Sequence, residues 1–391
     1  METEPMGIKA EPPKPRAAET AREDGSNKDD RPLLKSDSSR SSPVNIEELE
    51  KKYAAFVRND VYGPMGRGEL PLREKVLLAV ALVTFVPIRV VLAMFALVLY
   101  YVICRVCTLF SAPNRDEEEG QEDFAHMGGW RRAVIVTCGK LLSRFMLFLL
   151  GFYWISESCR DLELPQNNNS TQGKGQSEEP ERPGAIVSNH VSYLDILYHM
   201  SSSFPSFVAK RSVAKLPLVG LIRQQLFFNR ESKSSDFKGV SGIVTARVKE
   251  AHECRSSPMM MLFPEGTTTN GDYILPFKTG AFLAGVPVLP VILRYPYQRL
   301  SLAWDSISGV RHVIFLLCQF TNHMEVIRLP VYYPSQEEKD DPKLYANNVR
   351  QLMAREGNLF TSDIGLTEKR IYLAALNGNN SLPTVLHQKD D

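Results

Sequence analysis

A histidine and an aspartate lie five positions apart in His190-Val-Ser-Tyr-Leu-Asp195, directly after an apolar run at residues 184–188. The run predicts a buried strand, and Ser192 with Asp195 three residues later predicts the N-cap of a following helix. His190 then falls in the turn between them, where Asp195 can reach back to its ring from the first helical turn. That geometry fixes the tautomer of a general base. Taken alone, the pair favours the simpler interpretation of a capping carboxylate beside a packed turn histidine.

Other expected strands also end in polar groups. They are residues 204–209, ending at Lys210; residues 226–229, ending at Arg230; and residues 259–263, followed by Pro264-Glu265-Gly266-Thr267. Ligands of an open α/β sheet collect beyond the carboxyl ends of its strands. We therefore expect His190, Arg230 and Glu265 to surround one cleft.

The alternation of strand and helix patterns after residue 184 indicates an α/β domain, a mixed sheet flanked by helices. The other expected elements are a helix at 236–253, an extended segment at 286–294, a strand at 324–331 and a helix at 342–356. Pro287 and Pro290 place 286–294 at a sheet edge, because proline cannot donate to a central ladder. Asp341 and Gly357 have the positions of helix caps.

The chain before this domain is expected to contact a membrane. Residues 46–58 fit a short amphipathic helix. The long apolar run at 76–104 predicts a membrane segment. Pro87 and Arg89 interrupt its middle, so a bent hairpin in one leaflet competes with a simple span. A second run, 133–155, predicts a helix in the membrane interface, with a buried core helix as the alternative.

These patterns divide the chain into six expected parts. They are a disordered tail (1–45), a juxtamembrane segment (46–75), membrane and interfacial helices (76–160), a polar linker (161–183), a catalytic domain (184–335) and a C-terminal helical extension with its tail (336–391).

Composition narrows the classes of partner. A formal net charge of +1 over 391 residues argues against nucleic acid, since domains that bind phosphate backbones are usually clearly basic. The six cysteines have no framework spacing, which predicts reduced thiols on a cytosolic side. Cys104 and Cys107 have zinc-ligand spacing, but no second pair follows, and no two histidines make a convincing site. No metal is expected.

Four ordered blocks together resemble the glycerolipid acyltransferase family. They are His190-x4-Asp195, Phe227-Phe-Asn-Arg230, Phe263-Pro-Glu-Gly-Thr267 and Val286-Pro-Val-Leu-Pro-Val291. The longer match Phe263-Pro-Glu-Gly-Thr-Thr-Thr-Asn-Gly271, with Phe277-Lys-Thr-Gly-Ala-Phe282 and Arg294-Tyr-Pro296, is similar to the branch that acylates lysophosphatidylcholine and lysophosphatidylethanolamine. The whole chain resembles the plant members of that branch.

The resemblance implies an enzyme that moves a fatty acyl group from acyl-CoA, a co-substrate rather than a cofactor, to the free hydroxyl of a lysophospholipid. His190 is then the base and Asp195 orients it. The implied substrate-binding residues are Arg230, Glu265, Gly266, Thr267, Lys210 and Lys278. The chemistry agrees, because an alcohol is a poor nucleophile and a neutral imidazole with a pKa of about 6.5 can take its proton. The sequence contains no G-x-S-x-G motif, which would provide a serine nucleophile for an acyl-enzyme. We therefore expect direct transfer of the acyl group from acyl-CoA to the hydroxyl.

The same resemblance implies an endoplasmic reticulum membrane, with the catalytic domain facing the cytosol and lysophosphatidylethanolamine as the expected acceptor. Lysophosphatidic acid and glycerol 3-phosphate are alternative acceptors. A membrane scaffold without turnover is the other alternative, because fold does not guarantee function. The scaffold alternative rests on one difference from the family pattern, which usually has a glycine just before the strand that ends at the arginine. Residues 221–229, before Arg230, contain no glycine.

Overall fold

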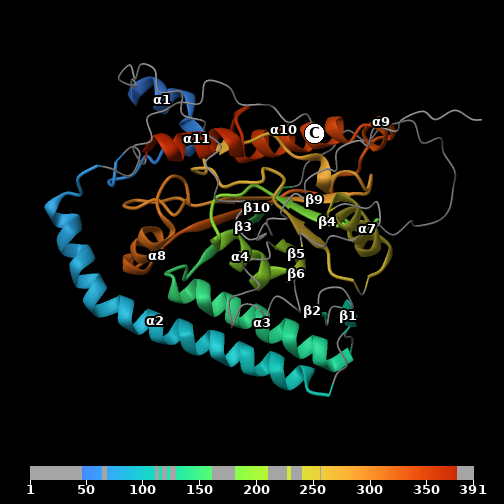
Figure 1. The fold of residues 1–391 in the computed structure, drawn as a ribbon, viewed down its shortest axis with the longest axis horizontal. Helices are drawn as coiled ribbons and strands as arrows, with labels where there is room; N and C mark the ends of the chain where they lie inside the picture. Colours follow the sequence, from blue (N-terminus) through green and yellow to red (C-terminus); the bar gives the residue numbers. More distant parts are fainter. Residues whose placement is uncertain are drawn as a thin grey trace, which may run out of the picture. The chain divides into compact units, whose positions relative to one another are not determined.

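A seven-stranded mixed sheet forms the centre of the protein (Figure 1). The computed structural model describes residues 46–63, 68–110, 114–116, 121–123, 129–160, 181–209, 227–229, 240–255 and 257–376. The strands of the sheet are β3 (Ile155–Cys159), β4 (Ala185–Ser188), β5 (Ser206–Ala209), β6 (Phe227–Asn229), β7 (Met260–Leu262), β9 (Val288–Arg294) and β10 (Met324–Arg328). Their order is β3-β10-β9-β4-β7-β5-β6, and β9 with β10 is the antiparallel pair among them. Two short pairs lie outside it: β1 (Asn114–Asp116) with β2 (Gln121–Asp123), and β8 (Tyr273–Ile274) with β11 (Phe360–Thr361).

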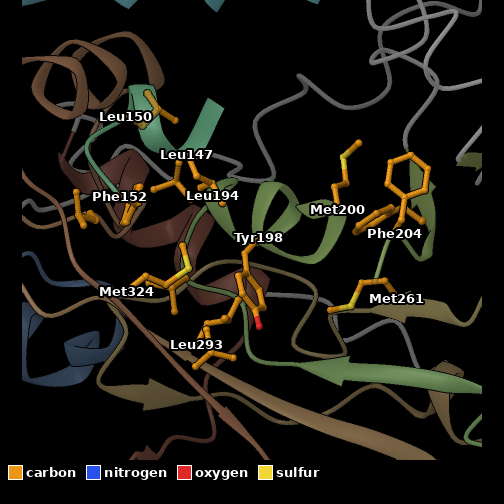
Figure 2. Close-up of a cluster of buried hydrophobic side chains, with 14 of the residues drawn as sticks. Leu147, Leu150, Phe152, Leu194, Tyr198, Met200, Phe204, Met261, Leu293 and Met324 are labelled. Atoms are coloured by element: carbon orange, nitrogen blue, oxygen red, sulfur yellow. The ribbon is translucent and has the colours of Figure 1, made fainter. Parts of the chain in front are cut away.

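Alternate residues of the central strands enter two separate apolar cores, as the period of two in a strand requires. Ile186, Val291 and Leu293 belong to the core shared with α3 (Gly129–Leu149) and α4 (Leu194–Ser202), part of which is shown in Figure 2. Val187 and Ile292 belong to the other core, shared with α7 (Val240–Glu253) and α10 (Pro342–Gly357). Helices thus cover both faces of the sheet, which confirms the expected fold class.

The long apolar run forms one continuous helix, α2 (Leu72–Thr108), of 37 residues. The alternative of a bent hairpin is therefore wrong, because the helix continues through Pro87 without a turn. Among the described helices, α2 is the one that is long and apolar enough to cross a membrane. Arg89 is buried and donates to the carbonyl oxygens of Leu317 and Gln319 at 2.7 and 2.6 Å. These carbonyls end α8 (Gly309–Cys318), so the arginine satisfies acceptors that a helix end leaves open.

The second apolar run forms α3, which packs beside α2 (Figure 1). Its exposed side includes Leu141, Phe145 and Phe148. Arg144 turns inward and donates to the carbonyl oxygens of Phe152 and Tyr153 at 2.9 and 2.8 Å. The face of α3 that points away from the protein is therefore apolar, like the exposed face of α2.

The structure differs from several local predictions made from the sequence. β9 lies between β4 and β10 rather than at an edge. Pro290 is tolerated because it lies just beyond the last pair of the β10 ladder, Arg328 with Val291, and its carbonyl still accepts the Leu329 N–H at 3.1 Å. Asp341 caps α10 as expected, but the C-cap is Asn358, in the left-handed region, one residue beyond Gly357. The expected helix at 46–58 is shorter: α1 covers Ile46–Lys52, and a 3-10 turn, η1, covers Ala54–Phe56.

The sheet takes elements from beyond the stretch 184–335. β3 pairs with β10 in parallel from within the stretch expected to be membrane-associated. α10 and α11 (Leu366–Leu376) follow residue 335, and α10 contributes Tyr345, Val349 and Met353 to the core on its face of the sheet. The tail and most of the linker lie outside the described residues.

Candidate active site

The turn that carries His190 is held against the neighbouring strand by the residue before it. β4 and β9 are parallel, with Ser188 opposite Val291, so both strands end at the same edge of the sheet. The Asn189 amide continues the ladder where β4 stops. It donates to the Leu293 carbonyl at 2.9 Å and accepts the Leu293 N–H at 2.8 Å. His190 thus starts from a fixed backbone position.

Asp195 meets His190 as expected, but it is not held by a Ser192 cap. α4 begins at Leu194, and Ser192 Oγ is buried without a partner among the described residues. Asp195 Oδ2 accepts from His190 Nδ1 at 2.8 Å and from the backbone N–H groups of Val191 and Ser192 at 2.8 and 3.0 Å. Its Oδ1 accepts from the Tyr295 hydroxyl at 2.5 Å. Four donors therefore compensate a carboxylate with no solvent exposure.

The imidazole presents its other nitrogen to the outside. The His190 side chain is 19% exposed and stacks on the Phe263 ring, with 4.2 Å between ring centroids. The bond from Nδ1 to Asp195 places the ring proton on Nδ1 and leaves the lone pair on Nε2. Within the described part of the chain Nε2 has no hydrogen-bond partner. This arrangement suits a general base.

Glu265 supports the histidine turn from inside the protein. Its Oε1 accepts the His190 N–H at 2.7 Å, and its Oε2 accepts the Leu275 N–H at 2.8 Å. The residue is 3% exposed. Burial raises the pKa of its carboxyl to about 8, although the two backbone N–H groups favour the charged form. Both carboxylate oxygens of Glu265 thus bind the backbone, and its expected role in substrate binding stays a prediction.

Gly266 and Lys278 form the outer side of the same turn. Gly266 has φ +71, a conformation that other residues rarely adopt, and a Cβ there would meet Lys278 Cε at 3.1 Å. The Gly266 N–H donates to the Phe263 carbonyl at 3.1 Å. Lys278 is exposed, and Thr267 is half-buried. A cationic side chain therefore lies over the Glu265-Gly266 turn.

The segment after this turn is fixed by both ends of the described chain. Asn270 donates to the carbonyl oxygens of Ala54 and Val57, at 2.9 and 3.0 Å. From α11, Lys369 Nζ donates to Thr268 Oγ1 and to its carbonyl oxygen, both at 2.7 Å. Regions far apart in the sequence thus hold residues 263–270 in place.

Two expected site residues, Lys210 and Arg230, lie outside the described residues, as does the glycine-free run before Arg230. The parallel strands β5 and β6 lead toward them from the same edge of the sheet as β4 and β7. Their roles stay predictions. Among the described side chains, no group of three or more His, Cys, Asp or Glu could hold a metal ion.

Two residues beside the dyad were not predicted to act there. Asn189 belongs to the stretch that carries His190, and Tyr295 belongs to Arg294-Tyr-Pro296, a segment that resembles the family. A signal for Tyr295 exists: it directly follows β9, and a strand parallel to β4 must end near His190. The sequence alone could not place Tyr295 there, because the two prolines of β9 predicted a sheet edge and not a position beside β4.

An acyltransferase is the class of enzyme that this fold and dyad define, and comparisons with known proteins agree. The family model described as Acyltransferase matches residues 167–294. The lysophospholipid acyltransferase LPEAT1 of Arabidopsis thaliana is 64% identical over 94% of this chain and 96% of its own length. Lysophosphatidylcholine acyltransferase 1 of Danio rerio is 32% identical over 77% of this chain and 54% of its own length. The chain belongs to the lysophospholipid acyltransferase family.

A solved structure is also similar, the 1-acyl-sn-glycerophosphate acyltransferase PlsC of Thermotoga maritima. It covers 68% of this chain and 98% of its own, at 19% identity and a TM-score of 0.35.

Proposed function

We propose that this acyltransferase moves a fatty acyl group from acyl-CoA to the free hydroxyl of a lysophospholipid, with lysophosphatidylethanolamine as its main acceptor. One observation carries the proposal: His190 is held by Asp195 through Nδ1, and its Nε2 faces outward at the carboxyl ends of parallel strands. The lysophospholipid acyltransferase relatives support the acceptor class.

The reaction follows from the dyad. His190 Nε2 takes the proton of the lysophospholipid hydroxyl as its oxygen attacks the thioester carbonyl carbon. Asp195 stabilises the imidazolium that forms. The tetrahedral intermediate then collapses, the carbon–sulfur bond breaks, and the imidazolium returns its proton to the thiolate of CoA. No resident cofactor takes part, and acyl-CoA is a co-substrate.

The charged groups of the substrates have candidate partners around the Glu265-Gly266 turn. Lys278 extends over Gly266 and can attract a phosphate. Lys210, Arg230 and Thr267 complete the proposed substrate-binding set, with Arg230 suited to a bidentate phosphate contact. In this proposal Glu265 acts through the turn that it fixes and does not touch the glycerol backbone.

The exposed apolar faces of α2 and α3 support a position on the membrane. Val83, Val91 and Phe95 of α2 are 77%, 67% and 63% exposed. An apolar surface of this kind is a common mark of membrane contact. We place the enzyme at the endoplasmic reticulum membrane with its active site on the cytosolic side, where both lipid substrates partition into the leaflet.

A panel of acceptors tests the proposal. Membranes containing the full chain receive one labelled acyl-CoA and, in separate reactions, lysophosphatidylethanolamine, lysophosphatidylcholine, lysophosphatidic acid or glycerol 3-phosphate. Membranes with an empty vector set the background. We expect the fastest labelling with lysophosphatidylethanolamine. Labelling confined to the last two acceptors would overturn the acceptor class, and no labelling above background would favour the scaffold.

A further inference from the structure

Tyr295 reaches the catalytic carboxylate from a strand that carries none of the predicted catalytic residues. It directly follows β9, which ends beside β4 at the edge of the sheet that holds His190. Its hydroxyl donates to Asp195 Oδ1 at 2.5 Å, and its side chain is buried within the core shown in part in Figure 2. The other three donors to this carboxylate all reach Oδ2. Among the described residues, Tyr295 is the donor to Oδ1.

We propose that Tyr295 is a positioning residue for acyl transfer, which orients the Asp195 carboxylate toward His190 and sets the strength of that contact. This inference rests on the proposed role of His190 as the base. Tyr295 itself touches neither substrate.

Two physical effects support the role. A carboxylate held at both oxygens cannot rotate away from the imidazole, so the Nδ1 tautomer persists. A donor on Oδ1 also draws negative charge from Oδ2, which weakens the pull of the carboxylate on the Nδ1 proton. Burial and the adjacent Asp195 raise the pKa of Tyr295 well above its ordinary value, so the phenol stays protonated and remains a donor.

The direction of the pH effect follows. Without the phenol, the buried carboxylate keeps more negative charge on Oδ2 and favours a protonated imidazole. His190 then loses its base function at a higher pH than in the wild type. The charged and titratable groups coupled to Asp195 or His190 are His199 of α4, Glu265 of the 263–266 turn and Tyr295 after β9. Tyr193, Tyr198, Arg328 and Arg350 interact electrostatically with those three groups rather than with the dyad.

Tyr295→Phe and Tyr198→Phe are a matched pair of variants. Tyr198 is also buried in the same core, and its hydroxyl accepts from Arg328 at 2.8 Å, away from Asp195. For Tyr295→Phe we expect kcat to fall about tenfold or more with little change in KM, and the acid limb of the rate profile to move to higher pH. Tyr198→Phe should match the wild type in both. A Tyr295→Phe enzyme that behaves like Tyr198→Phe overturns the proposal.

A second variant keeps the size and hydroxyl of residue 295. Replacing Tyr295 by 3-fluorotyrosine makes a stronger donor, so the acid limb should move to lower pH, opposite to Tyr295→Phe. An unmoved limb contradicts the role, even where Tyr295→Phe fails to fold. His190→Ala separates the two claims: retained activity in that variant refutes the base itself, whereas its loss with an unaffected Tyr295→Phe refutes only the positioning.

Discussion

Asp195 and Glu265 approach the His190 turn from two sides, and backbone N–H groups satisfy much of each carboxylate. Asp195 binds the ring and the two N–H groups that follow it, whereas Glu265 binds the N–H of His190 itself. Spacing in the sequence showed that Asp195 could reach His190 from the first helical turn, although the pair taken alone favoured a capping carboxylate. The partner of Glu265 could not be predicted, because His190 lies 75 residues away and meets it only through the pairing of β4 with β7.

Glu265→Ala should impair both stability and acyl transfer. It leaves the buried N–H groups of His190 and Leu275 without acceptors, at a cost of about 1–3 kcal/mol each, and it frees the histidine turn. We expect a lower melting temperature and a kcat reduced at least about tenfold for both substrates. Glu265→Gln keeps one acceptor and should fall between the two enzymes.

Glu337→Gln is the control, since Glu337 is exposed on α9 (Gln336–Asp340). Melting temperatures and rates with varied acyl-CoA and varied lysophospholipid provide the comparison. An increase confined to the KM for the acceptor would instead support a direct contact between Glu265 and substrate.

At the level of elements, helices outside the predicted catalytic stretch bind parts of that stretch. α11 brings Lys369 to Thr268 and to the Trp304 carbonyl, and Arg89 joins α2 to the end of α8. Arg89 could be recognised in the sequence as an interruption of an apolar run. The hydrogen-bond partners of Arg89 could not be predicted, because the acceptor carbonyls lie at the end of a helix more than 200 residues later. The edge position expected for β9 was wrong because the β10 ladder ends just before Pro290 would have to donate an N–H.

The buried Lys369 makes the free energy of unfolding depend on pH. Burial lowers its pKa from 10.5 to about 8, so the folded state binds fewer protons than the unfolded state between these values. The contribution of Lys369 to the free energy of unfolding therefore rises with pH across that window, by about 3 kcal/mol in total. Below pH 8 both states hold the charged lysine, and the contribution is constant at its least favourable level.

Thermal unfolding of the detergent-solubilised chain from pH 7.5 to 10.5 measures this effect. The melting temperature of the wild type, minus that of Lys369→Met, should increase over the window. Lys343→Met replaces an exposed lysine of α10 and should show a constant difference. A constant or decreasing difference for Lys369→Met would contradict the buried, readily deprotonated lysine.

At the scale of the whole molecule, the α/β sheet and the apolar helices α2 and α3 form one structure rather than separate modules. α3 packs between α2 and α4, and α4 begins one residue before Asp195. The apolar faces that we assign to the membrane therefore belong to the same packed body as the dyad. The alternating patterns were sufficient to predict the fold class, because each strand and helix is amphipathic on its own. The way α2 packs depends on contacts that no local pattern contains.

The most direct test of the account compares acyl transfer by the wild type, His190→Ala and His323→Ala. Membranes with equal amounts of each protein receive labelled acyl-CoA and lysophosphatidylethanolamine. His323 is exposed and outside the site, so its variant should keep the wild-type rate. Loss of the base should slow His190→Ala by about 10²-fold or more. A His190→Ala enzyme that transfers acyl groups at the wild-type rate would contradict the account.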